Sequence, residues 1–135
     1  MNIDGGCHCG YIAYEAEVDS ERVGICHCTD CQTLSGSAFR TIAFTKPGTF
    51  RLRSGEVKVY VKTAESGNKR QQSFCPECGT PIFSTSTDND PNKVHALRVG
   101  SIRQRDMLIP KRQSWLRSSQ RWLGEVPSLP GVERA

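Results

Sequence analysis

The alternation of apolar and polar residues predicts short β-strands along most of the chain. Residues 56–62, EVKVYVK, alternate strictly, so three valines would lie on one face and Lys58, Tyr60 and Lys62 on the other. A period of two residues is typical of a half-buried strand. Residues 11–18, rich in β-branched and aromatic types, predict another strand, and turn and loop signals bound further strand candidates at 39–45, 50–53, 69–74, 82–86 and 93–99.

Helical signals are weak by comparison. No stretch before residue 103 carries apolar residues at helical spacing, and residues 114–123, SWLRSSQRWL, fit either a strand or one or two helical turns. The last residues, EVPSLPGVERA, contain two prolines and no periodic pattern. We therefore expect a mainly β, single-domain fold of antiparallel sheets over residues 1–124, followed by a loosely ordered tail at 125–135.

Composition indicates a small protein that a metal ion would help to stabilise. The 135 residues suffice for one domain, and a hydrophobic content of 36% suits a modest core. No apolar run approaches the about 18 residues of a membrane span, and the start, MNIDGGCHCG, lacks the regions of a secretion signal. We therefore expect a cytoplasmic protein without membrane contact, whose cysteines stay reduced and serve as metal ligands.

The net charge points only weakly to an anionic partner. It is formally +4, but it falls to about +1 when all seven cysteines bind two zinc ions as thiolates. Aromatic residues make up only 7% of the chain. Because a nucleic-acid-binding face combines clustered basic and aromatic side chains, nucleic acid is not the expected partner.

The seven cysteines form three closely spaced groups, which are the strongest chemical signal in the chain. The groups are Cys7-His8-Cys9, Cys26-His27-Cys28-Thr29-Asp30-Cys31 and Cys75-Pro76-Glu77-Cys78-Gly79. In the last group, a Cys-x-x-Cys-Gly turn directs two sulfur atoms to one point, and its glycine permits the left-handed backbone that closes the turn. This group predicts half of a closed zinc site.

Seven cysteines divide most simply into four and three. Four thiolates close a structural zinc site, whereas three leave the open position of a catalytic site. In this division Cys7 and Cys9 complete the CPECG site, and the central group holds a second ion. The spacing also allows Cys28 and Cys31 to join CPECG as a zinc ribbon, with three cysteines left over. Two further alternatives concern the second site. One of the three histidines could be its fourth ligand, or the cysteines could hold an iron–sulfur cluster.

Four segments carry a resemblance to a known family. In chain order they are GGCHCG, CHCTDCQTLSGSAF, FCPECGTPIF and VGSIRQRDMLIPKRQSWLRSSQRWL. Together they resemble the glutathione-dependent formaldehyde-activating enzyme family, whose domain centromere protein V shares. The resemblance covers roughly residues 4–124. One departure is Gln113, which stands where many members have a histidine.

The resemblance implies a β-tent fold of small antiparallel sheets with zinc-binding turns, and two zinc ions per chain. The structural ion would be held by Cys7, Cys9, Cys75 and Cys78. The second ion, with its open position, would be held by Cys26, Cys28 and Cys31. Directly after this cluster, three small residues could turn backbone N–H groups toward a carboxylate of the thiol substrate: Ser35, Gly36 and Ser37.

The implied activity is that of a zinc-dependent carbon–sulfur lyase, which reversibly joins glutathione or a similar thiol to formaldehyde or another small aldehyde. Metal coordination would hold the thiol as a thiolate at neutral pH. Asp30 and His27 are the candidates for a general base. Two other functions stay open: a non-catalytic zinc-binding interaction module, and a redox sensor whose central cluster releases zinc on oxidation. The sequence does not indicate the oligomeric state.

Overall fold

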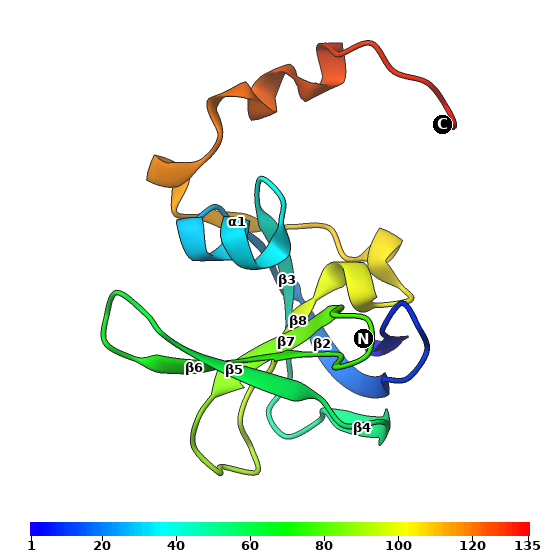
Figure 1. Ribbon diagram of the computed structural model, residues 1–135, viewed down its shortest axis with the longest axis vertical. Helices are drawn as coiled ribbons and strands as arrows, with labels where there is room; N and C mark the ends of the chain where they lie inside the picture. Colours follow the sequence, from blue (N-terminus) through cyan, green and yellow to red (C-terminus); the bar gives the residue numbers. More distant parts are fainter.

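β-strands dominate the backbone, as the alternation predicts. The computed structural model covers residues 1–135 and confirms a mainly β fold (Figure 1). The strands are β1 (Asn2–Gly6), β2 (Ala13–Cys26), β3 (Arg40–Thr45), β4 (Arg51–Ser54), β5 (Lys58–Thr63), β6 (Lys69–Phe74), β7 (Pro81–Ser86), β8 (Ala96–Arg98) and β9 (Arg112–Ser114). The helices are α1 (Thr29–Ser35) and four short 3₁₀ helices, at Val99–Ser101, Arg105–Met107, Leu116–Ser118 and Arg121–Ser128.

The long strand β2 connects all parts of the sheet. Its first half pairs antiparallel with β1 and β4, and its second half pairs antiparallel with β3 and parallel with β9. From β3 the sheet continues through β8, β7 and β6 to β5 at its edge. A register shift between Val18 and Val23 separates the two halves of β2. One strand therefore runs from the cysteine-bearing turn after β1 to Cys26.

Alternate residues of β2 supply much of the core. Tyr14, Ala16 and Val18 are buried, whereas the residues between them are partly exposed. They belong to one hydrophobic cluster with side chains of β7 and β8, such as Ile82 and Leu97. Removal of this apolar surface from water is the main force that holds the strands together.

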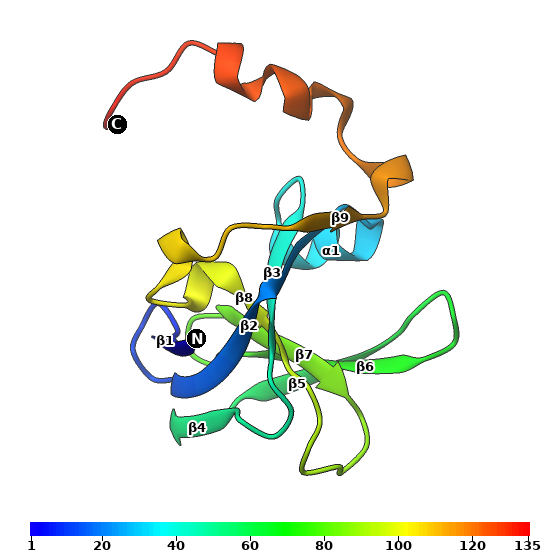
Figure 2. The same cartoon turned by 180° about the vertical axis from the view of Figure 1, so that it is seen from behind.

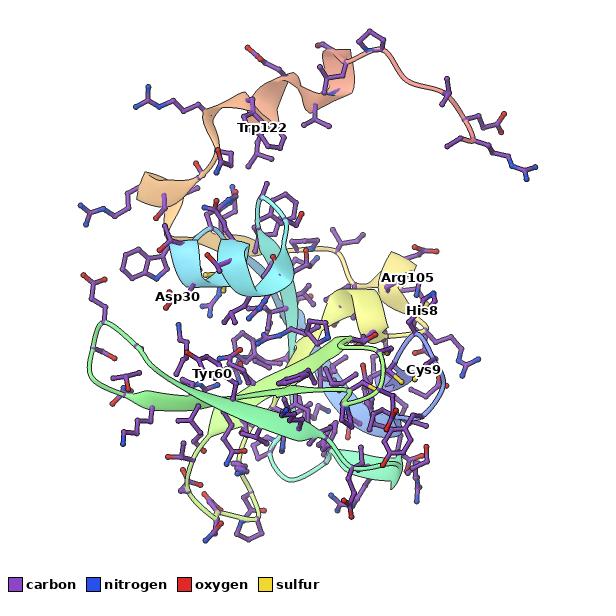
Figure 3. All side chains as sticks on the ribbon, in the orientation of Figure 1. His8, Cys9, Asp30, Tyr60, Arg105 and Trp122 are labelled. Carbon is purple, nitrogen blue, oxygen red and sulfur yellow. The ribbon has the colours of Figure 1, made fainter.

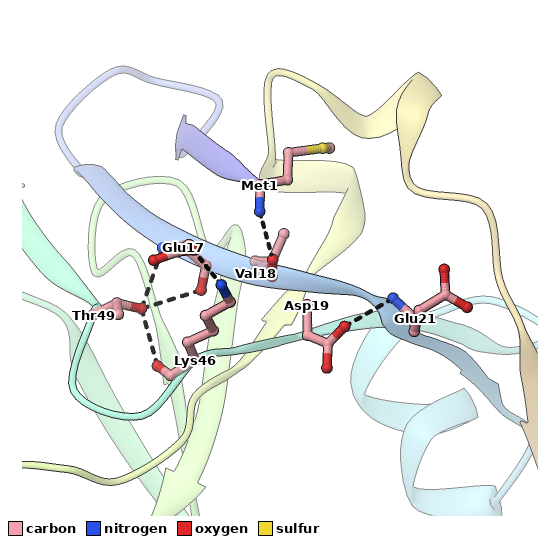
Figure 4. Close-up of polar contacts among 7 residues, drawn as sticks. All are labelled: Met1, Glu17, Val18, Asp19, Glu21, Lys46 and Thr49. Atoms are coloured by element: carbon pink, nitrogen blue, oxygen red, sulfur yellow. Dashed lines mark hydrogen bonds and ion pairs between the residues drawn. The ribbon is translucent and has the colours of Figure 1, made fainter.

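Polar contacts fasten the start of the chain and the β3–β4 turn to β2 (Figure 4). The amino group of Met1 donates to the carbonyl oxygen of Val18 at 2.9 Å. The hydroxyl of Thr49 accepts from the N–H of Glu17 at 3.2 Å and donates to the carbonyl oxygen of Lys46 at 3.0 Å. These bonds fix the outer face of β2 without contributing to either cysteine cluster.

Two local expectations were wrong. The strand β5 has no buried valine face, because Val59 and Val61 are 44% and 47% exposed. It is the last strand of the sheet, so it has a neighbouring strand on one side only. The helix α1 also lies in a region for which the sequence showed no helical pattern.

The C-terminal segment extends away from the sheet. Beyond β9 it forms two 3₁₀ helices and an irregular end, where the sequence was ambiguous, and it runs out past α1 in both views (Figures 1 and 2). Its apolar side chains Trp122, Val126, Leu129 and Val132 are exposed. None of the helices has the length and apolarity that a membrane crossing needs.

Candidate metal centre

Four cysteines from two turns far apart in the sequence lie together. Cys7 and Cys9 are in the turn between β1 and β2, where Figure 3 labels Cys9, and Cys75 and Cys78 are in the turn between β6 and β7. Their sulfur atoms all lie within 4.8 Å of one another. The structure thus brings the first and last cysteine groups together, and not Cys28 and Cys31 with CPECG as a zinc ribbon.

Backbone N–H groups point to sulfur atoms in both turns. The N–H of Ile12 donates to Cys7 Sγ at 3.1 Å, and the N–H of Glu77 donates to Cys75 Sγ at 3.4 Å. Gly79, with a φ of 77°, closes the second turn by donating its N–H to the carbonyl oxygen of Cys75 at 2.9 Å. Such hydrogen bonds favour the thiolate, which is the form that binds a metal.

The spacing of these sulfur atoms fits a tetrahedral ion. Cys9 Sγ lies 3.6 Å from Cys7 Sγ and 3.8 Å from Cys75 Sγ. Zinc–sulfur bonds of about 2.3 Å in a tetrahedron place the sulfur atoms about 3.8 Å apart. The four residues can therefore hold one metal ion with little rearrangement.

A second cluster forms where β2 meets α1. Cys26 is the last residue of β2, Cys28 is the N-cap of α1, and Cys31 is buried in its first turn. Cys28 Sγ accepts the N–H of Cys31 at 3.3 Å, as an N-cap side chain does. The three sulfur atoms lie within 4.8 Å of one another, and no histidine or carboxylate joins the group.

Each cluster contains a thiol with a strongly shifted pKa. A hydrogen bond with Thr80 lowers the pKa of Cys78 to about 5. Burial, followed by the hydrogen bond with Cys28, raises the pKa of Cys31 to about 12, although the charge of Arg40 opposes this shift. Closely spaced thiolates repel one another, so full ionisation of either cluster requires a cation among the sulfur atoms.

Gln32 ties α1 to both of its neighbours. Its Nε2 donates to the carbonyl oxygen of His27 at 2.8 Å and to that of Ser118 at 3.0 Å. Its Oε1 accepts from Gln120 Nε2 at 2.7 Å. One side chain therefore holds the second cluster against the segment that follows β9.

The two candidate general bases are engaged elsewhere. Asp30 is ion-paired with Lys62 of β5 at 2.7 Å. The ring of His27 is buried, and its Nε2 donates to Gln113 Oε1 at 2.8 Å. Gln113, the departure from the family pattern, thus fixes the orientation of this imidazole.

The small residues predicted to contact the substrate lie at the C-terminal end of α1. Gly36 caps the helix with a φ of 66°, and its N–H donates to the carbonyl oxygen of Gln32 at 2.9 Å. The N–H of Ser37 donates to Ser35 Oγ at 3.3 Å. The N–H groups of Gly36 and Ser37 are therefore used within the chain.

Sequence reasoning missed two buried arginines beside the second cluster. Arg40 pairs with Cys26 across β2 and β3, and Arg98 lies on β8, the next strand. Their exposed fractions are 6% and 7%. The only signal was their position in the strand-forming runs FRTIAFT and ALR, and an arginine in a strand normally faces solvent.

Trp115 is a third residue that the sequence did not single out for the site. It is the one non-glycine residue with a positive φ, 59°. It lines a cavity of about 260 Å³ together with Cys28, Asp30 and Lys62. Unusual backbone conformations concentrate at functional sites, and this cavity gives access to the second cluster.

The fold and the two clusters define a mainly β protein whose turns carry sulfur sites able to hold metal ions. The family model of the glutathione-dependent formaldehyde-activating enzyme (GFA) matches residues 2–118, so the chain belongs to this family. A crystal structure of a Rhodobacter sphaeroides protein, a structural-genomics target, is similar in fold. It shares 17% sequence identity with a TM-score of 0.59, over 82% of this chain and 99% of that one. No curated protein matches this chain.

Proposed function

We propose that this chain is a zinc-dependent carbon–sulfur lyase that reversibly joins a thiol, glutathione or a similar one, to formaldehyde or another small aldehyde. Membership of the GFA family supports the proposal. The observation that carries it is the cluster of three sulfur atoms without a fourth protein ligand. An ion held by three ligands keeps a position open for a substrate, which a site closed by four sulfur atoms does not.

In this proposal the cluster of four cysteines holds a structural zinc, and Cys26, Cys28 and Cys31 hold the second ion. The second zinc would supply the positive charge that lowers the pKa of a thiol at the open position. The new carbon–sulfur bond forms as the sulfur adds to the carbonyl carbon. The carbonyl π bond opens, and the thiol proton ends on the resulting hydroxyl group.

The chain's own contribution is to hold the sulfur ligands and the two substrates in place. Gln32 and the His27–Gln113 pair fix the segments on either side of the cluster. The cavity beside Cys28 gives the reactants a confined space next to the ligands. Holding two reactants in contact removes much of the entropic cost of bringing them together.

The test is an exchange measurement on protein purified without chelator. Because thiols also add to formaldehyde unaided, the readout is the rate of magnetisation transfer between glutathione and its hydroxymethyl adduct at equilibrium. We expect two zinc ions per chain and faster exchange than in buffer. Cys31→Ser should lose one ion and the acceleration, whereas Asp106→Asn, which changes an exposed carboxylate outside both clusters, should retain both.

Two results would contradict the proposal. One is a single ion per chain with three reactive thiols. The other is a protein that carries two ions and does not accelerate exchange with glutathione or with other small thiols. In the second case, loss of one zinc on peroxide treatment with the fold intact would favour a redox sensor.

A further inference from the structure

A second cavity near the second cluster is largely apolar and has a volume of about 400 Å³. Leu34 reaches it from α1, three residues after Cys31, and Arg40 reaches it from the strand position opposite Cys26. Figure 3 shows Tyr60 between the β5–β6 hairpin and α1, at the rim of this cavity. Gln72, Ser73, Phe74, Phe83 and Arg98 also line it.

The cavity contains two buried cations and no acidic side chain. Arg40 Nη1 and Arg98 Nη2 both donate to Gln72 Oε1, at 3.3 and 2.7 Å. Neither arginine takes part in any of the four ion pairs of the structure. Arg98 Nε and the hydroxyl of Ser73 are buried without a hydrogen-bond partner. Buried charges and donors of this kind are costly unless an acceptor satisfies them.

The neighbouring thiolates offset only part of this positive charge. With Cys26, Cys28 and Cys31 as thiolates around one divalent ion, the cluster would carry a net charge of about −1, against two guanidinium groups. Burial, followed by the charge of Arg40, lowers the pKa of Arg98 to about 9, although Cys31 counteracts the shift. One positive charge therefore remains without a counterion inside the cavity.

We propose that this cavity binds the carboxylate of a small organic acid, with Arg40 and Arg98 as its ligands. Arginine suits this task because its planar fork donates two parallel hydrogen bonds to a carboxylate. The identity of this acid rests on the proposed function: it is the thiol substrate itself, held by its carboxylate next to the cluster of Cys26, Cys28 and Cys31. The substrate class is therefore a thiol acid.

The rest of the lining fits the body of such an acid. Leu34, Phe74 and Phe83 present apolar surface, and the Ser73 hydroxyl supplies one more donor. A few polar groups that set orientation within an apolar wall are typical of small-molecule sites. The ligand is thus an acid with an apolar flank rather than a fully polar anion.

The test uses calorimetry on the metal-loaded protein, with phenylacetate as the probe and phenylacetamide as its neutral isostere. We expect phenylacetate to bind at least about tenfold more tightly, since hydrogen bonds to charged groups in a buried site are the strong ones. Arg40→Gln should abolish that difference. Arg70→Gln, which removes a half-buried arginine of β6 that lines a different cavity, should change it by less than about twofold.

Equal affinities for phenylacetate and phenylacetamide in the wild-type protein, or no effect of Arg40→Gln, would overturn the inference. The two arginines would then serve only to balance the thiolate charges. Phenylacetate contains no sulfur, so this result is independent of the lyase test. Arg40-dependent binding without accelerated exchange of glutathione or of other small thiols supports the carboxylate site and refutes the activity. Accelerated exchange without such binding supports the activity and refutes the carboxylate site.

Discussion

Gly5 of β1 lies where no side chain fits. A Cβ atom at this position would be 2.5 Å from Tyr14 Oη and closer still to the carbonyl oxygen of Ser101. The hydroxyl groups of Tyr14 and Ser101 form a buried hydrogen bond of 2.7 Å, so neither residue can move aside without breaking it. Close approach to the core, rather than an unusual φ, requires glycine here.

We expect Gly5→Ala to lower the free energy of unfolding by about 2 kcal/mol, because overpacking forces backbone or core side chains to shift. The measurement is equilibrium unfolding in denaturant. Gly100→Ala is the matched control, since its Cβ would meet nothing within 4 Å, and it should change stability by less than about 0.5 kcal/mol. Equal effects of the two variants would contradict the argument.

His95 is a titratable group within an aromatic cluster. Its ring stacks on Phe50 with centroids 4.6 Å apart and meets the edge of Phe83 at 4.9 Å, and its Nδ1 is buried without a partner. Burial, followed by the positive charges of Lys93 and Arg70, lowers the pKa of His95 from 6.5 to about 4. The folded protein therefore keeps this imidazole neutral where the unfolded chain protonates it.

Stability should fall as the pH drops from about 6.5 to about 4, since the unfolded chain binds the extra proton in that window. Because the ring is partly exposed, solvent screening reduces the expected loss to about 1 kcal/mol. His95→Phe keeps the aromatic stack and removes the proton. Unfolding curves over this pH range should show a weaker dependence in the variant, and parallel curves would refute the assignment. Release of metal in acid affects both proteins alike.

At the scale of elements, α1 shows why part of the site was not predictable. Its seven residues, TDCQTLS, bury only Cys31, so no periodic stripe marks it. The helix is held at its ends instead, by Cys28 at the N-cap and by Gly36 at the C-cap. An element that is held by its caps rather than by a buried face leaves little trace in hydrophobic periodicity.

We expect Gly36→Ala to cost about 1 kcal/mol of stability, because its φ of 66° strains any residue with a Cβ. It should also speed the loss of metal from the second cluster to a mild chelator. Gly67→Ala carries the same kind of strain in the β5–β6 hairpin, with nothing near its Cβ. The control variant should lose a similar amount of stability, and its rate of metal release should not change. Faster release from both variants would show that general destabilisation, and not strain next to the second cluster, releases the metal.

The strands were predictable where β-branched and aromatic residues or a preceding loop mark them. β3 and β7 were located to within a residue from their β-branched and aromatic residues, whereas the polar strand β6 (KRQQSF) was located from the loop that precedes it. In contrast, β1 (NIDGG) and β9 (RQS) have no such pattern, and they form because β2 offers free edges on both of its halves. Pairing with a distant strand overrides local propensity in these cases.

At the scale of the whole molecule, the cysteine clusters were predictable and their surroundings were not. Cysteine pairs at short spacing identify a metal site by residue type alone. The cavity arginines come from β3 and β8, which are neighbours only in the folded sheet. A site assembled from side chains 58 residues apart, such as Arg40 and Arg98, becomes visible only once strand order is known.

The cluster of four cysteines links parts of the chain that the sheet connects only indirectly. Cys9 and Cys75 are 66 residues apart in sequence, and their turns follow β1 and β6. A metal ion at this point closes a long loop, which disfavours the unfolded chain in the way that a cross-link does. The second cluster spans only six residues of sequence, so it constrains the unfolded chain far less.

We therefore expect Cys78→Ser to lower the free energy of unfolding by about 3 kcal/mol or more, comparable to the loss of a long-range cross-link. Cys26→Ser should cost roughly 1 kcal/mol, although Cys26 is the more buried of the two residues. Each variant should lose one metal ion, which native mass spectrometry can count beside the unfolding curves. A larger loss of unfolding free energy in Cys26→Ser would mean that burial of the cysteine, rather than loop closure, determines how much each site stabilises the fold. The ion held by Cys7, Cys9, Cys75 and Cys78 would then not be the main stabilising ion.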